Sequence, residues 1–171
     1  MRPLPKLFAK CLTSWTRSRL SGSSNVIRQL KEQFNAEGDV NLLGNNEYYD
    51  VHAIAGLLKT FLRELPAHIL TRELQQQFMH VVELGDRPAK VNQLGALIGQ
   101  LPSANYTLLR FLTAHLIHVV QNERINKMNL RNVGIVFSPT LAVPATLFSL
   151  LLTEFDIVFA VRCCYCPPFP V

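Results

Sequence analysis

Apolar residues recur every three or four positions through most of the chain, which is the spacing of one buried helix face. The pattern is clearest after Asp50, where Val51, Ile54, Leu58 and Leu62 share one stripe until Pro66 stops the helix. Ser23 or Ser24 can cap an earlier helix that Gly38 ends. The same spacing predicts helices over about residues 4–15, 24–37, 51–65, 69–84, 87–101, 104–120, 129–137 and 145–159.

No stretch longer than four residues alternates apolar and polar side chains in the way that a strand would. The helices differ in length and share no repeated signature, which argues against a solenoid. We therefore expect an all-α fold, a single-domain irregular helical bundle of six to eight helices over residues 1–159. Residues 160–171 lose the periodicity and contain three prolines, so we expect an unpacked tail there.

Composition excludes several classes of protein. With 49% hydrophobic and 17% charged residues, the chain is not of the intrinsically disordered type. The longest apolar run, 141–152, is interrupted by Pro144, so we expect no membrane span. The net charge of +5 lies in residues 1–20, which hold five basic residues and no acid, while residues 21–171 are balanced. We therefore expect no nucleic-acid binding. The acid-free amino end also suits a mitochondrial presequence, although the apolar stripe over residues 4–15 favours an amphipathic helix.

The sequence carries no recognisable signature of a self-contained catalytic or metal site. Three cysteines crowd into residues 163–166 without a matching Cys or His pair at zinc spacing, and the five histidines are scattered through helical stretches. A glycine-rich phosphate loop, GxSxG and HExxH are all absent. We expect no metal site, and the cysteine-free body fits a reducing cytosol.

One charged pair stands apart from this background. Lys59 and Arg63 lie four residues apart on a predicted helix, so their side chains leave the same face. The positions four residues away on that face hold no acid that would offset either charge. Spacing alone leaves two interpretations open: a solvated surface pair, or a cationic edge that meets an acidic partner.

Three blocks of the sequence resemble motifs of the RhoGAP domain, the activating module for Rho-family small GTPases. The segment LLKTFLRELP at residues 57–66 resembles the KxxLRELP signature. The segment MNLRNVGIVFSPTL at residues 128–141 is similar to a block of the form NLAxVFxPxL, and RLSGS at residues 19–23 resembles the end of the GIYRxSG finger-loop motif. The blocks follow the family's order over about residues 4–159.

The resemblance implies roles for five residues. Arg19 occupies the place of the arginine finger, a guanidinium that the activator inserts into the nucleotide site of its partner. Lys59 and Arg63 match the basic pair that supports the finger loop and contacts the GTPase, and Asn132 matches an asparagine of the contacting face. Thr140 stands where many members place an asparagine that touches the GTPase.

The function implied is an activator that stimulates GTP hydrolysis in trans, not an enzyme with its own substrate pocket. GTP and Mg²⁺ would belong to the partner, a Rho-family GTPase such as Rho or Rac, and the chain would need no cofactor. The implied state is a cytoplasmic monomer, recruited to membranes or the cell cortex only indirectly through the lipidated GTPase.

The sequence departs from the family pattern before the finger. Thr16, Arg17 and Ser18 replace the usual glycine, isoleucine and aromatic residue, and the stretch between Cys11 and Arg19 is short. We expect an incomplete or alternatively spliced segment here, and Arg17 competes with Arg19 for the finger role. The alternative function is a module that binds GTPases or scaffolds without activating them. A third is a helical interaction domain unrelated to GTPases.

Overall fold

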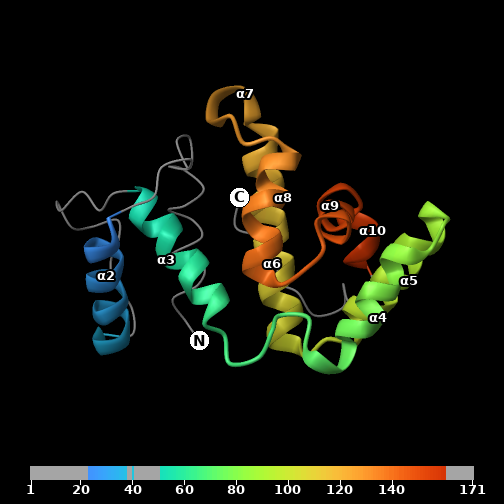
Figure 1. The fold of residues 1–171 in the computed structure, drawn as a ribbon, viewed down its shortest axis with the longest axis horizontal. Coiled ribbons are helices and arrows are strands. Elements are labelled where there is room, and N and C mark those ends of the chain that lie inside the picture. The colour runs from blue at the N-terminus through green and yellow to red at the C-terminus, as the bar shows by residue number, and fades with distance from the viewer. Residues whose placement is uncertain (1–22, 38–39, 41–50, 161–171) are drawn as a thin grey trace. The chain divides into compact units, whose positions relative to one another are not determined.

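The computed structural model describes residues 23–37, 40 and 51–160 (Figure 1). Every regular element in this part of the chain is a helix, which agrees with the all-α expectation. The helices, labelled as in Figure 1, are α2 (Ser24–Glu37), α3 (Val51–Arg63), α4 (Arg72–Glu83), α5 (Arg87–Gln100), α6 (Ser103–Gln121), α7 (Glu123–Asn126), α8 (Leu130–Leu141), α9 (Ala145–Thr153) and α10 (Phe155–Val158). The predicted helix over residues 4–15 and the predicted tail lie outside the described residues.

The observed helices match the predicted ones in order and number except at three places, and α4 also begins later than predicted, at Arg72. A one-turn helix, α7, follows α6 where no helix was predicted. Helix α8 continues past the predicted end at Phe137 and includes Pro139. The helix predicted over 145–159 is divided in two, because the backbone of Glu154 leaves the helical region at φ −113° and ψ 27°. The nine helices of the described residues therefore include two single turns beyond the expected set.

Two compact units are distinguished by their contacts. The first comprises Met1–Leu65 and His115–Val133, and the second comprises Pro66–Ala114 and Gly134–Val171. The chain passes from one unit to the other after α3 and again inside α6 and α8. Nothing in this division tests the predicted boundary between residues 159 and 160, which stays a prediction.

In the first unit, α2 packs closely against α3. Gly56 makes this approach possible, because a Cβ atom at that position would lie 2.6 Å from Cδ1 of Ile27. Leu30 of α2 and Ile54 and Leu58 of α3 are almost completely buried, as the apolar spacing predicted. Ala53, Ala55, Leu57 and Leu62 of α3 are buried as well, and Arg63 at its end is exposed.

In the second unit, α5 packs against both α4 and α10, and α4 also packs against α9. Asp86 caps α5: its Oδ2 accepts a hydrogen bond from the Ala89 backbone N at 3.2 Å. Tyr106 donates from its hydroxyl to the Phe159 carbonyl at 3.0 Å and packs edge-on against that ring. The core of this unit is apolar, and its largest buried side chains include Phe78, Leu94, Ile98, Phe137 and Phe148.

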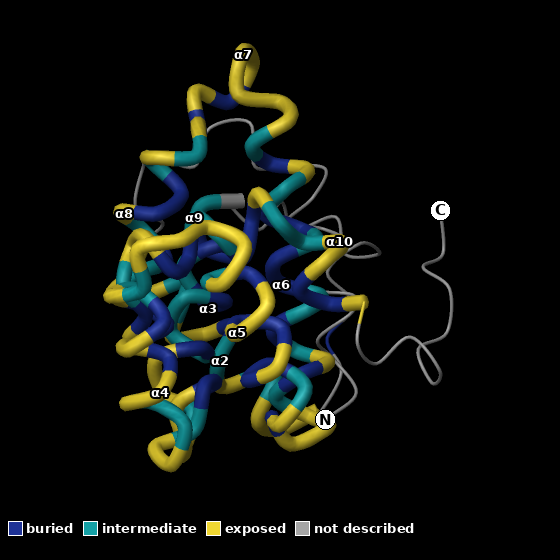
Figure 2. Tube along the Cα trace, turned by 90° about the vertical axis from the view of Figure 1, so that its right-hand side faces the viewer, coloured by how far each residue is buried: buried dark blue, intermediate teal, exposed yellow. Residues whose placement is uncertain are grey.

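Figure 2 shows how burial alternates along the helices, with buried and exposed positions following one another within each turn. Among the described residues, no single helix is long and apolar enough to cross a membrane. Helices α8 and α9 meet that criterion only when counted together, across a bend of 117°.

Candidate functional site

The basic pair predicted from the sequence lies on α3, in the first unit. The Lys59 side chain is half-buried and the Arg63 side chain is exposed. Burial lowers the pKa of the Lys59 ammonium, and the nearby positive charge of Arg63 lowers it further. The two cations therefore share one face of the helix close enough to repel each other, as their spacing indicated.

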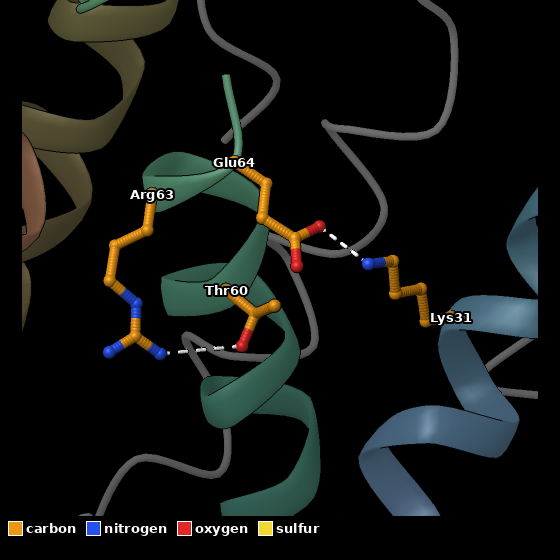
Figure 3. A network of polar contacts seen from close by, with 4 residues as sticks. All are labelled: Lys31, Thr60, Arg63 and Glu64. Atoms are coloured by element: carbon orange, nitrogen blue, oxygen red, sulfur yellow. Dashed lines mark hydrogen bonds and ion pairs between the residues drawn. The ribbon is translucent and has the colours of Figure 1, made fainter. Parts of the chain in front are cut away.

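Glu64, the acid that follows Arg63 in the sequence, forms an ion pair with Lys31 and not with Lys59 or Arg63. Figure 3 shows the Glu64 carboxylate directed toward Lys31 of α2, with 2.6 Å between Oε2 and Nζ. Arg63 extends along the other side of α3, where its Nη2 lies 3.4 Å from the Thr60 hydroxyl oxygen, at the long limit of a hydrogen bond. Within the part of the chain that the structure describes, neither Lys59 nor Arg63 forms an ion pair.

Asn132 also belongs to the first unit, in the first turn of α8. Its side-chain Nδ2 donates to the Lys127 carbonyl at 2.9 Å, and its backbone N donates to Oδ1 of Asn129 at 2.9 Å. Asn129 is thus the N-cap of α8, at the position where the sequence predicted that this helix starts. The Asn132 amide group holds the loop between α7 and α8, and its side chain is partly exposed.

Thr140 is placed differently from the other candidates. It lies in the second unit and is only 8% exposed. Its hydroxyl donates to the Val136 carbonyl one turn back, at 2.9 Å. The hydroxyl that was expected to contact a partner is therefore directed to the backbone of its own helix.

Arg19 and its competitor Arg17 lie outside the described residues. The structure consequently describes four of the five predicted site residues, Lys59, Arg63, Asn132 and Thr140, and brings the first three into one compact unit. The role of Arg19 as a finger stays a prediction.

Sequence reasoning missed a residue that shapes this unit. Asn126 is 5% exposed; its Nδ2 donates to the Val119 carbonyl at 2.7 Å, and its Oδ1 accepts from the Met128 backbone N at 2.8 Å. These bonds fix the reversal between α6 and α8 that presents Asn132. The signal was available, because asparagines recur at positions 122, 126, 129 and 132, and asparagine side chains commonly satisfy backbone groups in turns.

The described residues include no group of three or more metal-binding side chains. One open groove of about 260 Å³ lies in the second unit between α5 and α10. Its polar lining includes Arg87 and Glu154, which are paired with each other. The groove therefore offers a neutralised ion pair and the amide of Asn92 beside apolar side chains.

Comparison with known proteins identifies the family. Residues 16–146 match the model of the RhoGAP domain. The probable Rho-type GTPase-activating protein 2 of Schizosaccharomyces pombe is 44% identical over 141 residues, and the match covers 82% of this chain but 11% of that protein. The GTPase-activating protein BEM3 of Saccharomyces cerevisiae is 37% identical over 183 residues, covering 91% of this chain and 16% of that protein.

A solved structure agrees with these matches. The crystal structure of human Rho GTPase activating protein 15 superposes with a TM-score of 0.80 at 25% identity, covering 90% of this chain and 82% of that one. The present chain spans a small fraction of the length of the two curated relatives, so it corresponds to one portion of proteins of that kind.

Proposed function

The chain belongs to the RhoGAP domain family, and from this premise we propose that it stimulates GTP hydrolysis by a Rho-family small GTPase. The observation that carries the proposal is the cationic face of α3. Lys59 and Arg63 stand side by side although they repel each other, and no carboxylate of the described residues pairs with either. An acidic surface on a partner would relieve that repulsion.

In this proposal, Arg19 supplies the catalytic guanidinium in trans. Hydrolysis places negative charge on the oxygens around the γ-phosphate, and a guanidinium inserted there stabilises the transition state. An arginine finger accelerates hydrolysis by about 10³–10⁵ in Ras-type systems. A lysine would serve poorly, because its compact ammonium cannot donate hydrogen bonds to several oxygens in one plane as a guanidinium does. GTP and Mg²⁺ belong to the GTPase, so the chain needs no cofactor.

Lys59 and Arg63 are proposed to hold the partner and to support the finger segment. The exposed Arg63 has five N–H donors in a fixed plane, which suits a carboxylate on an opposing surface. Lys59, being half-buried already, would lose less conformational freedom when a partner covers it. Asn132, which is partly exposed, would add an amide contact. We further propose that the chain acts as a monomer in the cytoplasm and reaches the cell cortex with its partner.

Phosphate release from GTP-loaded Rho and Rac, with and without the full chain, tests this function. We expect Arg19→Ala to lower the stimulated rate by about 10³-fold or more while leaving GTPase binding within a few-fold. Arg17→Ala removes the same charge two residues away and separates the finger from its competitor: if Arg19 is the finger, Arg17→Ala leaves stimulation intact, and the reverse result would assign the role to Arg17. A chain that stimulates equally well without the Arg19 guanidinium would remove Arg19 from the mechanism.

A second candidate is a docking module that binds the GTPase without activating it. The replacement of the usual glycine, isoleucine and aromatic residue by Thr16, Arg17 and Ser18 favours it, because those residues position the finger. Binding to a GTPase loaded with a non-hydrolysable GTP analogue, without any effect on phosphate release, would select this candidate.

A further inference from the structure

A group of cations surrounds the short helix α7. Arg124, Lys127 and Arg131 are all exposed, while Glu123 is the single acid between residues 115 and 133. None of the three cations forms an ion pair within the described residues. Lys127 lies against α7, since its Nζ donates to the Arg124 carbonyl at 2.8 Å. The segment therefore carries a net charge of +2, whereas the rest of residues 21–171 carries a net charge of −2.

An aliphatic side chain stands among these cations. Ile125 is 68% exposed, more than any other large hydrophobic residue of the described part of the chain. Figure 2 shows α7 as a largely exposed turn in the connection between α6 and α8. We call Arg124, Ile125, Lys127 and Arg131 the α7 surface.

The backbone beneath the α7 surface is firmly held. Asn126 ties α7 to α6 through the Val119 carbonyl, and Asn132 ties α8 to the Lys127 carbonyl. Lys127 itself has φ 59°, a left-handed conformation that ends α7 with a hydrogen bond from its N to the Glu123 carbonyl. Because these hydrogen bonds hold the turn in place, the exposure of Ile125 is a property of the fold and is not caused by a frayed helix end.

We propose that the α7 surface binds the anionic surface of a lipid bilayer, with Ile125 inserted among the headgroups and the three cations beside them. Anionic lipids attract basic residues near a membrane, and an aliphatic side chain gains further by leaving water. A specific protein partner usually buries about 800 Å² on each side around aromatic or arginine anchors in pockets. A single helical turn with one isoleucine does not offer such an area, whereas a bilayer requires no matching shape.

The proposal adds a direct membrane contact to the indirect one that the family resemblance implies. It stands apart from the proposed function, because lipid binding requires neither a GTPase nor Arg19. In a complex formed on a membrane, the α7 surface would hold the chain at the bilayer independently of the contacts of Lys59 and Arg63.

Co-sedimentation with phosphatidylcholine vesicles containing 30% phosphatidylserine tests the proposal on the full chain. Each cation is expected to contribute about fivefold in vesicle affinity, so R124Q/K127Q/R131Q should bind about 100-fold more weakly. Ile125→Ser should weaken binding by about tenfold. The matched controls are Arg72→Gln and Ile157→Ser, which remove an exposed cation and an exposed isoleucine from other helices. Both controls should bind as the unchanged chain does.

The amino-terminal segment carries five cations of its own and is present in every variant. If the triple variant keeps the vesicle affinity of the unchanged chain, the α7 surface is not a lipid site and the proposal fails. If that variant also loses binding to a soluble GTPase, the α7 surface contacts a protein instead of a bilayer. Circular dichroism and thermal unfolding of each variant confirm that it folds.

Discussion

Lys31 of α2 and Glu64, one residue beyond the end of α3, are joined by an ion pair with 2.6 Å between Nζ and Oε2. The two residues are 33 positions apart in the chain, and their ion pair connects α2 to the carboxyl end of α3. It also directs the Glu64 carboxylate away from Arg63, so the guanidinium next to it in the sequence stays available (Figure 3).

Removing this ion pair should cost little stability. The two side chains are 44% and 51% exposed, and ion pairs at such positions contribute about 0–1 kcal/mol. We expect Lys31→Ala to lower the free energy of unfolding by less than about 1 kcal/mol, measured by urea denaturation. Adding Glu64→Gln completes a double-mutant cycle, and a coupling energy above about 2 kcal/mol would contradict this view of a solvated pair.

Arg63→Ala should weaken binding to a GTP-loaded Rho-family GTPase by about tenfold, because a charge-assisted hydrogen bond contributes about 1.5–3 kcal/mol. Isothermal titration with a non-hydrolysable analogue measures the affinity. Thr60→Val is the control, since it removes only the hydroxyl that lies 3.4 Å from the guanidinium. An Arg63→Ala variant with unchanged affinity would place the partner on another surface.

Gly56→Ala should separate α2 from α3. The new Cβ would lie 2.6 Å from Cδ1 and 3.3 Å from Cγ1 of Ile27, so the isoleucine must move. Overpacking typically costs 1–3 kcal/mol, and alanine returns up to about 1 kcal/mol of helix propensity. We expect a net loss of about 1 kcal/mol in thermal or urea unfolding.

Ile27→Val tests the cause of that loss, because valine lacks the Cδ1 atom. The double variant Gly56→Ala/Ile27→Val should be less destabilised than the sum of the single variants. Strict additivity would show that the close approach of Gly56 to Ile27 is not the source of the effect.

Stability should fall in mild acid through His115. This side chain is 3% exposed, and burial lowers its pKa from 6.5 to about 4, with a smaller contribution from His118. A histidine with a lowered pKa binds its proton more weakly when the chain is folded. Its contribution is therefore complete above pH 6.5, decreases as the pH falls, and is lost below about 4. The shift corresponds to about 3 kcal/mol.

Urea unfolding of the full chain between pH 4 and 7 measures this dependence. His115→Gln should flatten the curve in that range, whereas His68→Gln, at an exposed position, should leave it unchanged. An equally steep curve in the His115 variant would assign the acid sensitivity to other groups.

Asn126→Ala should be the most destabilising of the asparagine substitutions in the α6–α8 reversal. It leaves the Met128 N–H without its partner in a buried place and removes one of the two hydrogen bonds that the Val119 carbonyl accepts, the other coming from the Asn122 backbone N at 3.2 Å. The expected cost is about 2–3 kcal/mol, since a buried group without a partner costs about 1–3 kcal/mol and a lost hydrogen bond about 1 kcal/mol. Asn122→Ala, which removes one exposed hydrogen bond to the His118 carbonyl, should cost less than about 1 kcal/mol. Equal losses in the two variants would contradict the burial argument.

The differences between predicted and observed helices have local causes. Helix α4 was predicted from Ile69 but begins at Arg72, because Thr71 takes φ 57° and Asn105 donates to the Ile69 carbonyl at 2.9 Å. A side chain 36 residues away thus competes with helix formation. Similarly, the break before α10 falls at Glu154, whose carboxylate pairs with Arg87. Neither interaction is visible in a local window of sequence.

The sequence by itself determined the helical class, the stripe that α3 buries and the shared face of Lys59 and Arg63, because a period of 3.6 residues acts over a few neighbouring positions. The family motifs were equally readable, and the match over residues 16–146 confirms them. Tertiary structure alone decided that Glu64 turns to Lys31, that Asn105 takes the Ile69 carbonyl before α4 and that Thr140 is buried. The first two outcomes depend on partners 33 and 36 residues away in the chain, and the third depends on how α8 packs, so no local window of sequence contains them.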